Sequence, residues 1–180
     1  MSDQQTIQPV KNWLETIVIG LNLCPFAQRE FIQNTIHYCV SEANTETALL
    51  TDLHIELNRL IAQPKIETTL LIHSKVLTNF DDYNQFLNLA DNLLETLDLS
   101  EQFQIASFHP DYQFAGTEFD DAENYSNRAP YPILHLLRQA SLSHAIEHHP
   151  DVNQIPLDNI KRLNALGTEH MKQLLVQTST

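Results

Sequence analysis

Apolar residues recur at helical spacing in several stretches of the chain. Intervals of three and four predict a first helix from about Pro9 to Asn22, with Pro9 in its first turn. The same spacing predicts a second helix that ends at Gln63-Pro64 and a third that begins after Asn79, which can serve as its N-cap. Two more helices are predicted over about residues 131–147 and 156–176.

Three short runs between these helices are rich in branched and aromatic side chains, as is typical of strands. They cover Thr35–Val40, Glu67–His73 and Gln104–Phe108. The predicted order is therefore α-β-α-β-α-β-α-α. Alternating strands and helices favour a single α/β domain over residues 1–180 with a small, mostly parallel sheet. A short edge strand near Tyr112–Ala115 would enlarge this sheet, and a ferredoxin-like α+β fold is the alternative.

Composition and charge restrict the class of protein. A net charge of -13 argues against a nucleic-acid partner, because phosphate binding requires clustered Lys and Arg. The apolar runs are too short to span a bilayer, and the start shows no signal peptide, so we expect a cytoplasmic protein with no membrane partner. Cys24 and Cys39 are too few for a disulfide framework and are interpreted as free thiols, Cys39 in the core.

The strand order predicts where a ligand would bind. In open parallel sheets, ligands lie beyond the carboxyl ends of the strands. Two predicted strands end at histidines, His73 and His109, and His109 opens the unusual segment FHPDYQFAGTEFDDAENYSNRAPYP, residues 108–132. Gly116 in this segment is expected to adopt a positive φ. A site for a small molecule is therefore predicted at this edge, with His109 as general acid/base or orienting donor.

Two arginines suggest that the ligand is anionic. Between Val76 and Ile160 the chain has fourteen acidic residues, and Arg128 and Arg138 are its only Lys or Arg. Arginine binds carboxylate and phosphate through a planar fork, and a helix that begins near Pro130 would add free N–H groups. The alternative is that Arg128 neutralises acidic neighbours in its own loop, namely Asp120, Asp121 or Glu123.

Several other residues are candidates within the 109–138 segment. His135 lies three residues before Arg138, so the two would share a helix face. Asn124 and Asn127 would either bind ligand or build turns, and Tyr112 and Tyr131 are further candidate ligand-binding residues. Cys24 is a candidate nucleophile with His109 as its base, although a position after a helix C-terminus does not activate a thiol.

Two alternative functions remain open at this point. One is a metal-dependent hydrolase in which His109 acts with His73 or His135 and an acidic loop residue, although no close ligand pair such as HExxH is present. The other is a non-catalytic interaction or oligomerisation protein whose 109–138 segment is a rigid cap. The sequence identifies no cofactor, no metal ligands, no substrate and no oligomeric state.

Three blocks of sequence resemble a known family. GLNLCPFA (residues 20–27), FHPDYQFAGT (residues 108–117) and NRAPYPILHLLRQ (residues 127–139) together resemble the bacterial family called domain of unknown function 1415. The resemblance covers nearly the whole chain. It implies a single-domain bacterial protein and suggests that the NLCPFA turn belongs with the other two blocks. It implies no activity, cofactor or catalytic residue.

Overall fold

The computed structural model describes residues 3–147 and 151–178. Its sheet contains four strands in the order β1-β2-β4-β3: β1 (Ile36–Val40), β2 (Thr68–Ile72), β3 (Phe103–Phe108) and β4 (Ile133–Arg138). β1 and β2 are parallel, whereas β4 runs antiparallel to both β2 and β3. The carboxyl ends of β1, β2 and β3 therefore meet the amino end of β4 at one edge.

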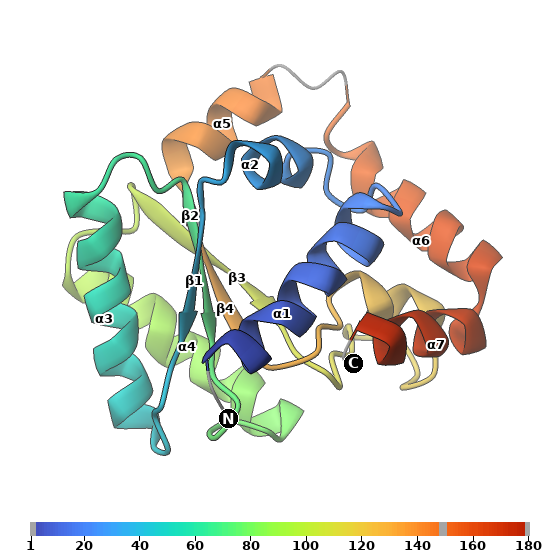
Figure 1. The fold of residues 1–180 in the computed structure, drawn as a ribbon, viewed down its shortest axis with the longest axis horizontal. Coiled ribbons are helices and arrows are strands. Elements are labelled where there is room, and N and C mark those ends of the chain that lie inside the picture. The colour runs from blue at the N-terminus through green and yellow to red at the C-terminus, as the bar shows by residue number, and fades with distance from the viewer. Residues whose placement is uncertain (1–2, 148–150, 179–180) are drawn as a thin grey trace.

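Helices cover both faces of this sheet (Figure 1). One face packs against α3 (Glu46–Ala62) and α4 (Phe80–Thr96) through a core that includes Leu53, Leu71 and Phe86. The other face packs against α1 (Asp3–Trp13) and the π-helical turn η1 (Leu14–Ile19), with Trp13 and Ile17 fully buried. On this side α6 (Gln154–Leu166) and α7 (Thr168–Thr178) complete the layer. Two shorter helices, α2 (Ala27–Gln33) and α5 (Gln139–Glu147), flank the amino end of β1 and the carboxyl end of β4.

The mixed α/β class, the three predicted strands and both helices between them are confirmed. The Asn79 side chain caps α4 by accepting from the N–H groups of Asp81 and Asp82. Gly116 has a φ of 85°, as expected. The sheet is not mostly parallel, however, because two of its three pairings are antiparallel. Its strands follow the chain order β-α-β-α-β-β, which also differs from the ferredoxin-like order β-α-β-β-α-β.

Most other differences arise where a local pattern is ambiguous. The predicted helix over residues 131–147 is wrong in its first half, which forms β4. No strand forms at residues 112–115. The first helix begins at Asp3, which places Pro9 inside it, and α2 was not predicted. The last predicted helix is divided into α6 and α7 by Gly167, which has a φ of 81°.

Candidate functional site

A cleft of about 460 Å³ opens at the sheet edge where the three parallel strands end. Every connection at this edge contributes to its wall. The lining residues are Val40 at the end of β1 and Glu42 after it, Ser74, Lys75 and Thr78 after β2, Pro110 after β3, Pro130, Tyr131 and Pro132 before β4, and Thr6 from α1. The three prolines fix their own backbone φ angles, which makes this part of the wall rigid. A cleft therefore lies at the edge that the strand order predicts.

Lys75 supplies the positive charge of this cleft. It is the only basic residue among the described lining residues, and its side chain is 52% exposed. Its Nζ donates a hydrogen bond to the Glu42 carboxylate across the cleft wall, which lowers the pKa of that carboxyl. The hydroxyl groups of Ser74, Thr78 and Tyr131 are further polar groups of the lining. The cleft thus offers one cation, one anion and several hydroxyls.

His73 and His109 lie directly behind the cleft, each one residue before a lining residue, and both are fully buried. The rings of both stack or tilt against Tyr83, with centroids 5.8 Å and 5.1 Å away. His109 Nδ1 accepts from the Asp111 N–H, so its Nε2 carries the proton and donates to the Leu77 carbonyl. Since both nitrogens are occupied by backbone groups, this geometry leaves His109 no free nitrogen for proton transfer.

Burial sets the ionisation of the two rings. It lowers the pKa of His73 to about 4 and also lowers the pKa of His109. His73 Nδ1 bonds the Val76 carbonyl at 3.0 Å, whereas its Nε2 is buried with no hydrogen-bond partner among the described residues. Both rings are therefore neutral near pH 7, and they are buried beside residues that line the cleft without lining it themselves.

The Tyr83 side chain connects β3 and β4 at this edge of the sheet. Its hydroxyl donates to the Ile133 carbonyl at 2.8 Å and accepts from the Phe108 N–H at 3.1 Å, inside the core. We expect Tyr83→Phe to lower the free energy of unfolding by about 1–2 kcal/mol, because the Ile133 carbonyl and the Phe108 N–H each lose one hydrogen bond. Urea unfolding would measure this. Tyr131→Phe is the control, since no hydrogen bond of its hydroxyl occurs in the described part of the chain; equal losses in both variants would contradict the role of Tyr83.

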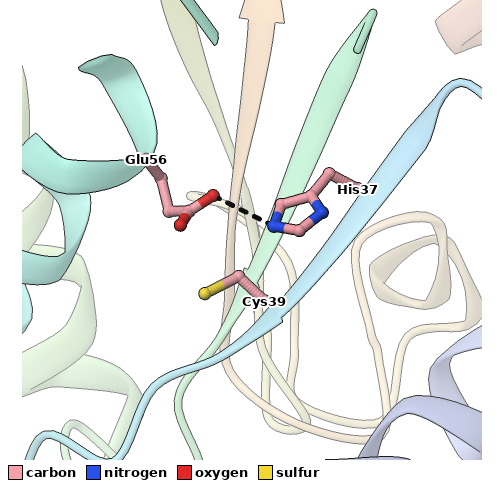
Figure 2. A group of neighbouring side chains, drawn as sticks. All are labelled: His37, Cys39 and Glu56. Atoms are coloured by element: carbon pink, nitrogen blue, oxygen red, sulfur yellow. Dashed lines mark ion pairs between the residues drawn. The ribbon is translucent and has the colours of Figure 1, made fainter. Parts of the chain in front are cut away.

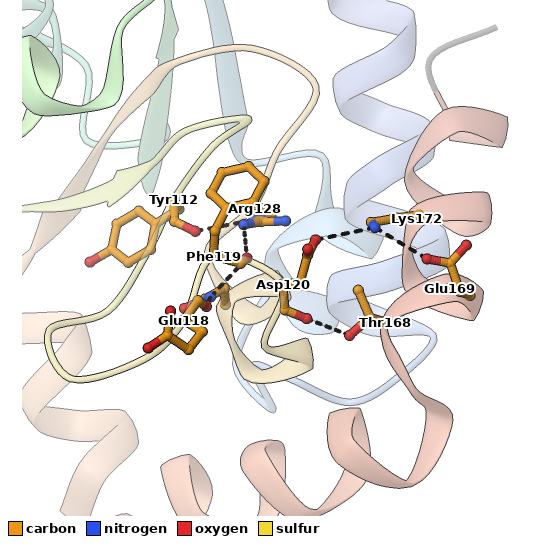
Figure 3. A network of polar contacts seen from close by, with 9 residues as sticks. Tyr112, Glu118, Phe119, Asp120, Arg128, Thr168, Glu169 and Lys172 are labelled. Carbon is orange, nitrogen blue, oxygen red and sulfur yellow. Dashed lines mark hydrogen bonds and ion pairs between the residues drawn. The ribbon is translucent and has the colours of Figure 1, made fainter.

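Arg128 is directed away from solvent and toward its own loop (Figure 3). The residue is 3% exposed, its Nε donates to the Tyr112 carbonyl at 3.1 Å, and its Nη2 donates to the Phe119 carbonyl at 2.6 Å. The guanidinium lies between the rings of Phe119 and Tyr125, 4.5 Å and 4.6 Å from their centroids. No ion pair of Arg128 occurs among the described residues. Its hydrogen bonds go to backbone carbonyls, its cation contacts aromatic rings, and it is not among the residues that line the cleft.

The acidic residues near Arg128 have other partners. Asp120 pairs with Lys172 of α7 at 3.2 Å, and its carbonyl accepts from Thr168. The Asp121 carboxylate accepts from the Glu118 N–H at 2.8 Å. The alternative was that Arg128 neutralises Asp120, Asp121 or Glu123. None of these three forms an ion pair with Arg128 in the described part of the chain.

The two asparagines of the segment build the loop. Asn124 is fully buried; its Oδ1 accepts from the Phe114 N–H and the Thr117 hydroxyl, and its Nδ2 donates to the carbonyls of Glu118 and Phe119. Asn127 Nδ2 donates to the Ser107 carbonyl at 3.0 Å. The Tyr112 ring packs on Phe80 and Phe114. Of the candidate ligand-binding residues, Tyr131 lines the cleft. Asn124, Asn127 and Tyr112 instead stabilise the 108–132 segment.

Arg138 and His135 lie elsewhere, because β4 runs antiparallel to its neighbours. Arg138 is at the opposite end of the sheet, where it donates to the carbonyls of Leu60, Gln63 and Ile66 near the end of α3. His135 Nε2 contacts the Thr68 hydroxyl at 2.6 Å on the α1 side of the sheet, and burial lowers the pKa of His135 to about 4. On a strand, residues three apart point to opposite faces, so the two do not share a face.

Cys24 is not joined to His109 by any contact in the described part of the chain. It packs at the margin of the core beside α1, and burial raises the pKa of its thiol. The nitrogens of His109 are occupied as well, so this structure shows no assembled nucleophile and base. The thiol is free, as is that of Cys39.

Metal-ligand side chains converge at one place among the described residues, and it is not the predicted one. His37, Cys39 and Glu56 each bring a ligand atom within 4.8 Å of the others (Figure 2). The set of His73, His109 and His135 with an acidic loop residue forms no such group in the described ranges. The sequence did not reveal this group, because Glu56 lies on α3 whereas His37 and Cys39 lie on β1.

These features define a mixed α/β protein with a cleft at the carboxyl edge of its parallel strands. The chain belongs to the family described as protein of unknown function (DUF1415), whose family model matches residues 5–173. This confirms the resemblance carried by the three sequence blocks. No curated protein and no solved structure matches the chain. None of the described helices is long and apolar enough to cross a membrane.

Proposed function

We propose that the protein binds a small anionic molecule in the cleft at the carboxyl edge of the sheet. The observation that supports this most is the position of Lys75, an exposed cation in a concave site that is formed by the connections of all four strands. The chain as a whole carries a net charge of -13, so an anion is attracted here by local groups and not by the overall field. Hydroxyls of Ser74, Thr78 and Tyr131 would donate to its oxygens.

The Glu42 carboxylate narrows the kind of anion. It lies beside Lys75 in the same wall and accepts hydrogen bonds only. A ligand with a carboxylate or phosphate for Lys75 and an amino or hydroxyl group for Glu42 would match both. Amino acids, hydroxy acids and phosphorylated alcohols have this chemistry, whereas simple dianions would be repelled by Glu42.

A thermal-shift screen tests this function. We expect a compound of the matched class to raise the Tm of the wild type, and Lys75→Gln to abolish that rise because the cation is lost. Lys161→Gln is the matched control, since Lys161 is an exposed lysine on α6 whose partner is Asp158, away from the cleft. The proposal fails if no small acid or phosphate raises the Tm, or if the rise persists in Lys75→Gln.

A further inference from the structure

A polar cluster interrupts the apolar contact between β1 and α3. His37 and Cys39 are two residues apart on β1, so both side chains lie on the face that packs against α3. Glu56 of α3 points toward them and is only 2% exposed (Figure 2). Helix positions that face a sheet are normally apolar, and the neighbours Leu53, Leu57 and Leu60 follow that rule. A buried carboxylate at this position requires specific partners.

The three ligand atoms have the spacing of a metal site. His37 Nε2 and Glu56 Oε2 are 3.3 Å apart, and the Cys39 Sγ lies within 4.8 Å of both. Zinc bonds of about 2.0–2.3 Å at tetrahedral angles place neighbouring ligand atoms roughly 3.3–3.8 Å apart, so side-chain shifts of about 1 Å would complete the site. We propose that His37, Cys39 and Glu56 bind a zinc ion.

The chemistry of the donors selects the metal. One imidazole, one thiolate and one carboxylate form a mixed N, S and O set, which suits zinc and disfavours magnesium or calcium. With three protein ligands, a water or a second ligand takes the fourth position. The His37 side chain is 30% exposed on an edge strand, so solvent reaches the site.

Arg59 donates to the Glu56 carboxylate and leaves some of its lone pairs available for a metal ion. Its Nε donates to Glu56 Oε1 at 3.0 Å and to Oε2 at 3.2 Å. A carboxylate has about four lone-pair sites, so the same group can accept from Arg59 and bind a metal. In many metal sites, a second partner of this kind holds the ligand in its productive orientation.

Charge balance also favours a bound cation. Asp52, one turn before Glu56 on α3, accepts a hydrogen bond from Ser41, the residue after β1, at 2.5 Å, beside the same polar contact. Asp52 and Glu56 carry two negative charges, and Arg59 carries one positive charge. A divalent ion bound with Cys39 as a thiolate would neutralise the remaining negative charge. The site lies on the α3 face of the sheet and does not depend on the proposed function of the cleft.

Metal titration of tag-free protein, treated with chelator and dialysed, tests this site. We expect one zinc per chain in equilibrium dialysis, and a rise in Tm of about 5–10 °C at a zinc concentration 100-fold above Kd. Cobalt(II) in place of zinc should produce a thiolate-to-cobalt charge-transfer band. Cys39→Ser should remove this band and weaken zinc binding by more than the ~10–100-fold that loss of a supporting contact costs.

Matched variants distinguish this site from adventitious binding. Cys24→Ser removes the other thiol and should leave stoichiometry and spectrum unchanged, whereas Glu56→Gln should weaken binding with the charge-transfer band as readout. A folded wild type that shows no band and no zinc-dependent rise in Tm would overturn the proposal. So would a band that survives in Cys39→Ser or disappears in Cys24→Ser.

Discussion

Replacement of Arg128 with methionine is expected to lower the free energy of unfolding by about 2–4 kcal/mol. Methionine fills similar space, but the Tyr112 carbonyl loses its Arg128 donor and the Phe119 carbonyl keeps only the 3.3 Å bond from Asn124. The contacts with the Phe119 and Tyr125 rings also lose their cation. A buried carbonyl that is left unpaired costs about 1–3 kcal/mol, and one that keeps a second donor costs less. Removal of the buried Arg128 charge also removes its desolvation penalty, which offsets part of this loss. Urea unfolding at pH 7 measures the difference.

Two further variants show whether the fork geometry or the charge matters. Arg128→Lys keeps the cation but cannot donate to both carbonyls in the same plane, so we expect an intermediate loss. Arg29→Met, on α2, removes an arginine that is 69% exposed and should change stability by no more than about 0.5 kcal/mol. If Arg128→Met is as stable as Arg29→Met, Arg128 does not hold the loop.

Local patterns predicted the elements whose neighbours in sequence are also their neighbours in space. β1 and β2 with α3 between them, and α4 before β3, follow directly from apolar spacing and from the cap at Asn79. β4 is different, because its run ILHLLR is central in the sheet and pairs with strands from two distant segments. A short apolar run fits a buried strand and a buried helix equally well. The pairing that decides between them is not local.

The unpredicted strand β4 explains why only part of the candidate site was predicted. The ends of β2 and β3 at His73 and His109 were placed correctly, and the cleft lies there. Arg138 was expected beside Arg128 because a helix would have kept them close. The six residues of β4 instead carry Arg138 to the other edge of the sheet. Counting charges found the isolated arginines, but only the tertiary structure shows that carbonyl oxygens surround them.

Acid should destabilise the protein through His73. Burial lowers its pKa to about 4 in the folded state, against about 6.5 in an unfolded chain. As the pH falls, the unfolded chain binds a proton first, so this contribution to stability is complete above pH 6.5 and is lost toward pH 4. The full difference of about 2.5 pK units corresponds to roughly 3 kcal/mol. The pKa of His109 and that of His135 are lowered as well, and these two rings act in the same direction.

A comparison of variants isolates the contribution of His73 to the pH dependence of the unfolding free energy. His73→Asn retains a donor for the Val76 carbonyl but does not titrate, so its unfolding free energy should fall less steeply between pH 6.5 and 4. The slope should decrease by up to about 1.4 kcal/mol per pH unit, the value for one proton. His54→Asn is the control for replacing a histidine with asparagine, because His54 is exposed on α3. Equal slopes in wild type and His73→Asn would show that His73 is protonated equally in the folded and unfolded states, so burial would not lower its pKa.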